Sequence, residues 1–340
     1  MESLYRYMPA DWAERFRLKG ADISLRSMVR YAHPRGHLVR TDSTAPDGSA
    51  GGSDPQFTSK QLLDSWSIDI ALLINIESGT LAAGLAGPDD AVTLSRAVND
   101  FFLSEWTPSD ARYRYAMVIP TENPPAAAAE IDRVGANPAV AAVFMPLQNS
   151  LMGSRQYDPI YRAAAKQSLP IVVHPTGMDF RYYSGPAPIG LPESYVERYI
   201  NTSQIPAANL TNLIFTGAFE RFPELRVIFI EYGFSWLLPL MWRMDKAWRG
   251  LRIETPWVRK SPSDYVHGHV RLSTQPIDEP VDDRHIGALI DMMGDDLLLF
   301  ASDYPHWDND DPRRTLTLLP ADTRRRVFGL NAMQSLRITR

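Results

Sequence analysis

The segment LLLFASDYPHW, from Leu297 to Trp307, gives the clearest indication of the architecture. It begins with an apolar run long enough for one buried strand, and the run stops at a carboxylate, a proline and a histidine. Parallel strands have this composition because helices cover both faces of their sheet. We therefore expect Asp303 at the carboxyl end of a strand, where barrel proteins place their functional side chains.

Six other short runs share this apolar, β-branched character, and stretches with helical spacing lie between them. The predicted strands are Ile70–Ile76, Tyr115–Ile119, Ala141–Met145, Ile171–Val173, Val227–Ile230, Val270–Ser273 and Leu297–Ala301. The predicted helices include Leu94–Trp106, Pro124–Gly135, Pro159–Ser168 and Asp282–Gly294. This alternation predicts an α/β fold, a (β/α)8 TIM barrel that is one strand short.

The length of 340 residues suits one barrel, so we expect a single domain over residues 1–340. Residues 41–56, TDSTAPDGSAGGSDPQ, are rich in glycine, serine, proline and aspartate and predict a flexible surface loop. We do not interpret this loop as a linker between domains, because the residues before it could not bury a core of their own.

The composition argues against several classes of function. The formal net charge is -5 and the basic residues are scattered, which argues against nucleic acid as a partner. The absence of cysteine leaves only His, Asp and Glu as metal ligands. No signal peptide or apolar run of about 18 residues is visible, so we expect a cytoplasmic protein without membrane partners. Serine-hydrolase, zincin and nucleotide-binding motifs are also missing from the sequence.

Three predicted strands end in side chains that can carry chemistry. His174, Glu231 and Asp303 each follow an apolar run, so they are expected on the same face of the barrel. A histidine and an aspartate can bind one divalent ion such as zinc or manganese, while a further carboxylate transfers protons. Each residue also has a structural explanation: a turn cap for Asp303, a hydrogen-bonded core histidine for His174, and an arginine pair for Glu231.

Two histidine pairs have spacings that metal sites also use. His267 and His269 are alternate residues, which share a face in a strand, but they precede the strand at Val270 and so lie at its wrong end. His33 and His37 are one helical turn apart, but the sequence PRG between them interrupts a regular helix. We favour loop or structural positions for both pairs.

Four stretches together resemble the amidohydrolase-related family, which contains aminocarboxymuconate-semialdehyde decarboxylase, γ-resorcylate decarboxylase and many metal-dependent hydrolases. They are LPIVVHP (Leu169–Pro175), GAFERFPELRVIFIEYGFSWLLPLMWRMD (Gly217–Asp245), HVRLSTQP (His269–Pro276) and LLLFASDYPHWD (Leu297–Asp308). The segment GLNAMQSLRI near the C-terminus is a weaker match.

The resemblance implies a metal-dependent barrel in which His174 and Asp303 bind a divalent ion, zinc or manganese. The decarboxylases of this family carry an acid/base histidine after their sixth strand. Glu231 occupies the matching position here and implies a hydrolase-like branch, in which it transfers a proton or orients water. Asp303 thus counts both as a metal ligand and as a catalytic residue.

The same resemblance implies residues around the substrate. Trp236 and Trp307 would form walls of the pocket, and His306 would fix the geometry of the substrate or of the metal ligands. His269, in the HVRLSTQP stretch, is a further candidate for substrate binding.

Members of the family begin with a strand that ends in an HxH or ExH pair of metal ligands, and the present sequence starts at the segment that follows it. The resemblance therefore implies a barrel whose first strand, with its ligand pair, is missing or irregular. Catalytic zinc usually has about three protein ligands. Three explanations stay open: the start was lost or misassigned, another subunit supplies the ligands, or the chain is a degenerate homologue without metal.

The leading hypothesis is a metal-dependent hydrolase that acts on a small carboxylate-bearing or aromatic substrate, with a decarboxylase as one alternative. The contrasting hypothesis is a non-catalytic or partner-dependent subunit of a hetero-oligomer. A homodimer, or a hetero-oligomer with a catalytic homologue, is expected because a barrel without one strand exposes sheet edges. The aromatic and basic run from Trp242 to Lys260 could form such an interface, or it could be an amphipathic outer helix with its following loop.

Overall fold

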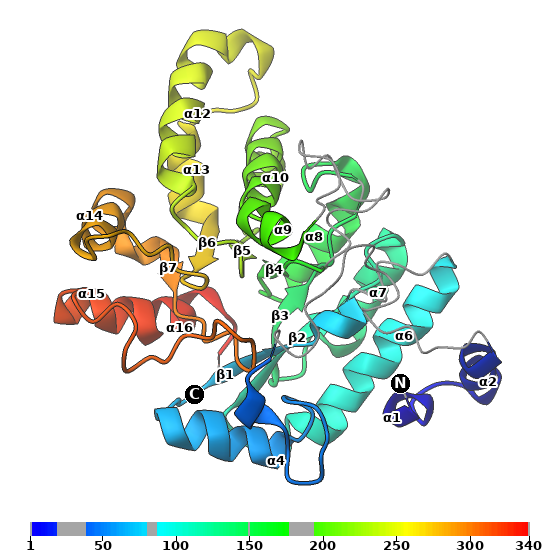
Figure 1. Cartoon of the computed structure of the whole chain (residues 1–340). Coiled ribbons are helices and arrows are strands. Elements are labelled where there is room, and N and C mark those ends of the chain that lie inside the picture. Colours follow the sequence, from blue (N-terminus) through cyan, green and yellow to red (C-terminus); the bar gives the residue numbers. More distant parts are fainter. Residues whose placement is uncertain (1, 19–38, 80–86, 149, 177–193, 339–340) are drawn as a thin grey trace.

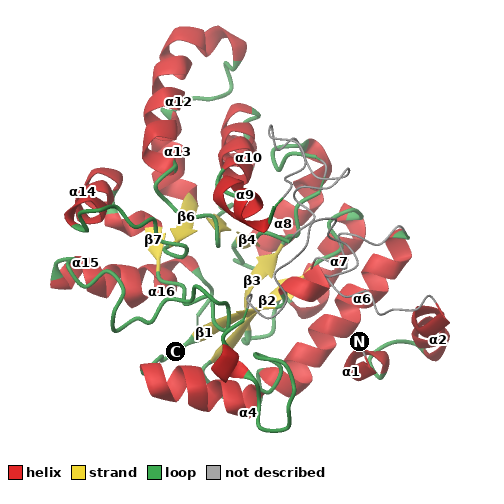
Figure 2. Cartoon of the chain, in the orientation of Figure 1, coloured by secondary structure: helices red, strands yellow, loops and turns green. Residues whose placement is uncertain are grey.

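The computed structural model describes residues 2–18, 39–79, 87–148, 150–176 and 194–338 (Figure 1). Seven parallel strands form one curved sheet in the order β1 to β7, and helices surround it (Figure 2). The strands are β1 (Ala71–Ile74), β2 (Tyr113–Val118), β3 (Val140–Phe144), β4 (Ile171–Val173), β5 (Val227–Phe229), β6 (Val270–Ser273) and β7 (Leu298–Leu299). All seven predicted strands are confirmed.

The helices fall between the strands, as the alternating sequence pattern predicts. Those before β4 are α1 (Glu2–Tyr5), α2 (Ala10–Leu18), α4 (Pro55–Thr58), α6 (Pro88–Phe101), α7 (Pro124–Val134) and α8 (Asp158–Lys166). Those after it are α9 (Tyr195–Asn201), α10 (Gln204–Phe215), α11 (Ala218–Arg221), α12 (Leu237–Leu251), α13 (Pro262–His269), α14 (Arg284–Met293), α15 (Ala321–Arg325) and α16 (Asn331–Ser335). The predicted helix at 94–106 begins earlier, at Pro88, and its last turn, Phe102–Trp106, is π-helical.

The core lies between the sheet and its surrounding helices. Every residue of β3, β4 and β5 is buried, which explains why these strands are continuous apolar runs rather than alternating ones. The surrounding helices begin at ordinary capping residues. The side chain of Asn123, for example, accepts a hydrogen bond from the amide of Ala126 at the start of α7.

The sheet has the curvature of a half-barrel. Within the described ranges, β1 and β7 are its two edges and do not pair with each other. The segment after residue 38 lies beside the carboxyl end of β7: Val39 forms an antiparallel bridge with His306, and the Arg40 amide donates to the Pro305 carbonyl at 2.9 Å. Whether a strand is missing from the barrel stays a prediction.

Residues 41–56 form a series of turns beside this end of β7. A short 3-10 turn, Thr41–Ser43, is followed by a tight turn in which the Ala45 amide donates to the Ser49 carbonyl at 3.1 Å. Ser43 and Ala45 are buried, so part of this predicted surface loop is packed against the protein. Its flexibility stays a prediction.

The run from Trp242 to Lys260 forms most of α12 and the turns that follow it. In Figure 1, α12 and α13 project away from the sheet. Trp242, Ile253 and Trp257 are exposed, while the role of this run in oligomerisation stays a prediction. His33 and His37 lie outside the described residues. Every helix in the described ranges is too short or too polar to cross a membrane.

Candidate functional site

The structure brings His174, Glu231 and Asp303 together at the carboxyl end of the sheet. They follow β4, β5 and β7, and one ligand-type atom from each lies within 4.8 Å of the others. Nε2 of His174 is 2.7 Å from Oε2 of Glu231. His174 is buried and the two carboxylates are largely buried, so this is an enclosed cluster of titratable groups.

The backbone at both carboxylates is unusual. Glu231 has φ 62° and Asp303 has φ 51°, the left-handed region that residues with a Cβ rarely occupy. The end of β6 supports the first of these turns, because the Glu231 amide donates to Oγ of Ser273 at 2.9 Å and that hydroxyl donates to the Gln275 carbonyl at 2.9 Å. Strained backbone of this kind is held by its surroundings and concentrates at functional sites.

The orientation of the His174 ring follows from one contact. Its Nδ1 lies 2.8 Å from the Pro175 carbonyl oxygen, which can only accept, so Nδ1 carries a hydrogen and Nε2 faces the carboxylates. Burial opposes the charged form, but the charge of Glu231 outweighs it and the pKa of His174 is raised. Burial likewise opposes ionisation of Glu231, yet the charges of His174 and His306 hold the pKa of Glu231 low. The carboxylates around Nε2 of His174 therefore favour a positive charge at this position.

Asp303 is the least satisfied member of the cluster. Burial and the neighbouring Glu231 charge raise the pKa of Asp303 to about 7. Its Oδ2 is buried and has no aligned hydrogen-bond donor among the described residues. Nδ1 of His306 lies 2.9 Å from this oxygen, but the same nitrogen makes its hydrogen bond to Oδ1 of Asp308. A buried carboxylate oxygen without a donor, beside a second carboxylate and an imidazole nitrogen, fits a divalent cation.

His306 and Asp308 connect the cluster to two neighbouring elements. Burial would lower the pKa of His306, but its contacts with Asp303 and Asp308 raise that pKa to about 10. The other oxygen of Asp308 accepts from the Tyr199 hydroxyl of α9 and from Nε2 of Gln275 at 3.1 Å. The sequence did not predict a role for Asp308, Tyr199 or Gln275. Asp308 and Gln275 had a signal, since both lie in stretches that resemble the family, and Tyr199 had none.

The two predicted wall residues both lie near the strand ends. Trp307 is half exposed, and its ring centroid is 6.1 Å from those of Tyr199 and His306. Trp236 is partly buried at the start of α12, where its Nε1 donates to the Gly233 carbonyl at 2.9 Å. Contact of either ring with a substrate stays a prediction.

His269 lies elsewhere. It is the last residue of α13 and precedes β6, so it is at the amino end of the sheet. Its ring stacks on Phe219 with centroids 4.4 Å apart, and its Nδ1 is 2.8 Å from the Leu225 carbonyl oxygen. This position corrects the expectation that His269 binds substrate. The ring packs against Phe219 instead, as its position before the strand at Val270 indicated.

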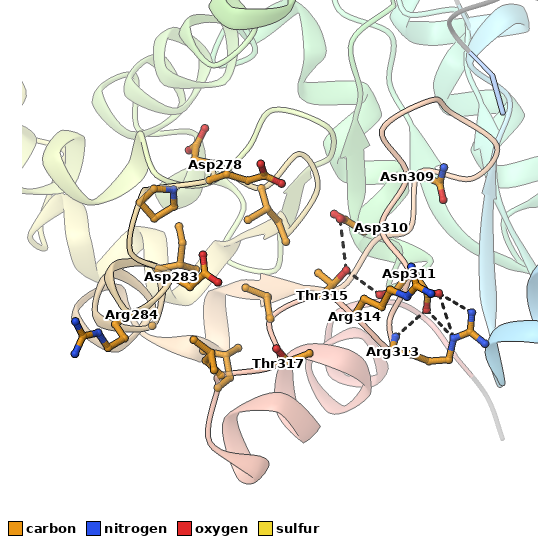
Figure 3. A pocket seen from close by; sticks show the side chains of 18 of the residues that line it. Asp278, Asp283, Arg284, Asn309, Asp310, Asp311, Arg313, Arg314, Thr315 and Thr317 are labelled. Carbon is orange, nitrogen blue, oxygen red and sulfur yellow. Dashed lines mark hydrogen bonds and ion pairs between the residues drawn. The ribbon is translucent and has the colours of Figure 1, made fainter.

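A separate cavity of about 790 Å³ is lined in part by Asn309, Asp310 and Asp311, which follow Asp308 in sequence (Figure 3). It is formed by the loop after β6, the start of α14 and residues 309–319, and none of the three clustered residues lines it. Its charged groups are largely paired or exposed, as with Arg313 and Asp311 at 2.6 Å. The cavity is therefore a separate feature from the cluster of His174, Glu231 and Asp303 at the strand ends.

Comparison with known proteins identifies the family. The sequence profile described as Amidohydrolase matches residues 76–338, which is most of the chain. The chain belongs to the amidohydrolase family. A relative within it is the gamma-resorcylate decarboxylase of Polaromonas sp. strain JS666, 26% identical over 262 residues that cover 72% of this chain and 75% of the relative. The gamma-resorcylate decarboxylase of Rhodococcus jostii strain RHA1 is 24% identical over 276 residues, covering 72% and 78%.

Solved structures show the same fold in amidohydrolase-type proteins. The 2,6-dihydroxybenzoate decarboxylase from Rhizobium has a TM-score of 0.66 and 20% identity, covering 91% of this chain and 96% of that one. The dihydroxybenzoic acid decarboxylase from Polaromonas sp. JS666, described with bound manganese and the inhibitor 2-nitroresorcinol, has a TM-score of 0.65 and 22% identity, covering 83% and 86%. The present chain thus shares its fold with these solved structures.

Proposed function

We propose that this protein is a metal-dependent decarboxylase of small aromatic carboxylic acids. The observation that carries the proposal is the convergence of His174, Glu231 and Asp303, in which the buried Oδ2 of Asp303 has no aligned hydrogen-bond donor among the described residues. The relatives and neighbours whose names state an activity on aromatic acids are decarboxylases, which favours this reaction over the hydrolysis expected from the sequence.

Nε2 of His174 and the carboxylate of Asp303 would hold the cation. His174 offers a nitrogen ligand and Asp303 an oxygen ligand, and this combination suits Mn²⁺ as well as Zn²⁺. Manganese is the ion described in two of the structural neighbours. The hydrogen bond from Nδ1 to the Pro175 carbonyl fixes the ring so that Nε2 is the available donor. When bound, the ion supplies positive charge that polarises the substrate and stabilises negative charge in the transition state.

Glu231 transfers the proton in this proposal. Its pKa is low while a charged His174 faces it, but binding of the ion at Nε2 would remove that partner, and burial then favours the protonated acid. Loss of CO2 from an aromatic acid requires that a proton reach the ring carbon that carried the carboxylate: the carbon–carbon bond breaks, CO2 leaves and a carbon–hydrogen bond replaces it. Glu231 is the remaining carboxyl group of the cluster once His174 and Asp303 bind the ion, and its turn is anchored to Ser273. Between turnovers it takes a proton from solvent.

The test is to supply Mn²⁺ to the purified protein with 2,6-dihydroxybenzoate or 5-carboxyvanillate, and to measure CO2 and the phenol product. An aromatic ester and an amide serve as hydrolysis substrates. We expect CO2 and phenol in equal amounts, and a rate about 10²- to 10⁴-fold lower for Glu231→Gln, because a general acid contributes this much.

The control is Glu224→Gln, the same change at an exposed position, which should leave the rate near that of the wild type. Manganese content should remain unchanged in Glu231→Gln. Hydrolysis of the ester or amide without CO2 from any acid would refute the decarboxylase proposal, and unaltered turnover in Glu231→Gln would refute the assigned role.

A further inference from the structure

Helix α9 presents one face to the functional site and the other to solvent. Helical spacing places Tyr195, Arg198, Tyr199 and Thr202 on one side. On this side Arg198 is only 8% exposed, whereas Val196 on the other side is 62% exposed. The guanidinium of Arg198 is therefore carried on the inner face of the helix.

The inner face of α9 is in direct contact with the residues around Asp303. The Tyr199 hydroxyl donates to Asp308, and the Tyr199 ring lies 6.1 Å from that of Trp307. The Tyr195 ring stacks on Tyr199 with centroids 5.9 Å apart. The positive charge of Arg198 also helps to hold the pKa of Glu231 low, after the larger effects of burial, His174 and His306. Arg198 thus belongs to the surroundings of the site although it lies on a helix remote from it in sequence.

The charges already in the site explain why an acidic substrate needs Arg198. Glu231, Asp303 and Asp308 repel an anion, and the two histidines near them are engaged with these same carboxylates. A guanidinium is always charged and offers a planar set of donors that matches a carboxylate, and a partly buried one binds more strongly than one in water. The flat rings on α9 and of Trp307 suit an aromatic substrate beside it.

We infer that Arg198 binds the carboxylate of an aromatic acid while Tyr195, Tyr199 and Trp307 border its ring. This inference rests on the proposed function, which it deepens by naming the residue that selects acids. It also accounts for product release, because the phenol left after CO2 departs has no carboxylate for Arg198 to hold. Arg198 is a substrate-binding residue in this account and takes no part in proton transfer.

The experiment measures equilibrium binding without turnover. The protein is treated with a chelator, and tryptophan fluorescence is titrated with 2,6-dihydroxybenzoate or with resorcinol, the same ring without the carboxylate. For Arg198→Met we expect a Kd for the acid that is about 10- to 100-fold higher, the effect of losing a charged hydrogen bond, and a Kd for resorcinol within about twofold. Arg198→Lys should lie between, since it keeps the charge but loses the planar fork.

Val196→Ala, on the solvent face of the same helix, should change neither Kd. Circular dichroism checks that each variant is folded. If Arg198→Met is not folded, Arg198→Lys is used for the test. Equal changes for acid and resorcinol, or an unchanged Kd for the acid in the folded variant, would overturn the inference. If Arg198→Met loses acid binding selectively but the wild-type protein releases no CO2 with Mn²⁺, the proposed function alone would be refuted. Release of CO2 with acid binding independent of Arg198 would refute this inference alone.

Discussion

Two clusters of buried polar groups in this protein are built in opposite ways. Around Asn99 of α6, the side-chain amide donates to the Val118 carbonyl at 3.0 Å and to Oε1 of Glu130 at 2.7 Å. Its oxygen accepts from the Val118 amide at 2.9 Å and from the Tyr115 hydroxyl at 3.1 Å. Around Asp303, by contrast, two carboxylates approach one another and Oδ2 has no aligned donor among the described residues.

The difference separates a polar cluster that serves the fold from one that serves a ligand. Four hydrogen bonds occupy both donors and both acceptor sites of Asn99, and such a cluster joins α6 to β2 and α7. The Asp303 cluster leaves a buried oxygen without an aligned donor among the described residues, and the backbone of Glu231 and Asp303 is in the left-handed region; both cost stability. Removing one group should therefore damage function in one cluster and stability in the other.

Asp303→Asn should have the largest effect. It removes a proposed ligand and a charge, so we expect metal content to fall to background and turnover to fall by more than the roughly 10- to 100-fold that loss of an outer-sphere partner causes. The melting temperature in the presence of a chelator should be unchanged or higher, because the repulsion with Glu231 is relieved. Elemental analysis and thermal unfolding measure the two effects.

Asp310→Asn is the matched control, since Asp310 is also a largely buried acid and its pKa is raised to about 6, chiefly by burial. It lines the separate cavity and not the cluster, so its metal content should equal that of the wild type. Full metal content in Asp303→Asn would contradict this prediction, because it would show that other residues hold the cation.

Asn99→Leu should show the reverse pattern. The new side chain has a similar size but leaves the buried Val118 amide without its acceptor and removes one of the two donors to Oε1 of Glu130, the other being Arg133. We expect the free energy of unfolding to fall by about 2 kcal/mol. Metal content and the KM for the aromatic acid should not change. Urea denaturation gives the stability, and a large loss of metal without a loss of stability would contradict the contrast between the clusters.

The sequence was sufficient to predict the strands but not how the sheet ends. Residues 171–173 and 270–273 were predicted without error, because strands buried on both faces are continuous apolar runs. Leu297–Ala301 was predicted too long: only Leu298–Leu299 pair with β6, and the backbone then turns toward Asp303. Whether two edge strands that are distant in sequence pair leaves no trace in local patterns, and β1 and β7 do not pair within the described ranges.

The cluster itself was also within reach of the sequence, since His174, Glu231 and Asp303 each follow an apolar run. The left-handed backbone of Glu231 and Asp303 and the lack of an aligned donor to Oδ2 of Asp303 were not, because these depend on contacts between separate strands. Arg198 and Tyr199 lie on a helix, where inward-facing polar residues resemble ordinary surface residues in sequence. For the same reason the sequence could not distinguish the Asn99 cluster from a functional one.

His269→Phe should have the smallest effect and tests the amino end of the sheet. Phenylalanine keeps the stacking on Phe219 and loses the hydrogen bond to the Leu225 carbonyl, so we expect a loss of about 1 kcal/mol at pH 7 and unchanged kcat, KM and metal content. Burial lowers the pKa of His269 in the folded protein, so the unfolded chain binds more protons there and the wild type loses stability as pH falls below about 6.5. The variant lacks this imidazole, so the difference in free energy of unfolding between wild type and His269→Phe should narrow as the pH falls from 7 to 5. A raised KM with unaltered stability would instead place His269 at the substrate and contradict the assignment of the two ends of the sheet.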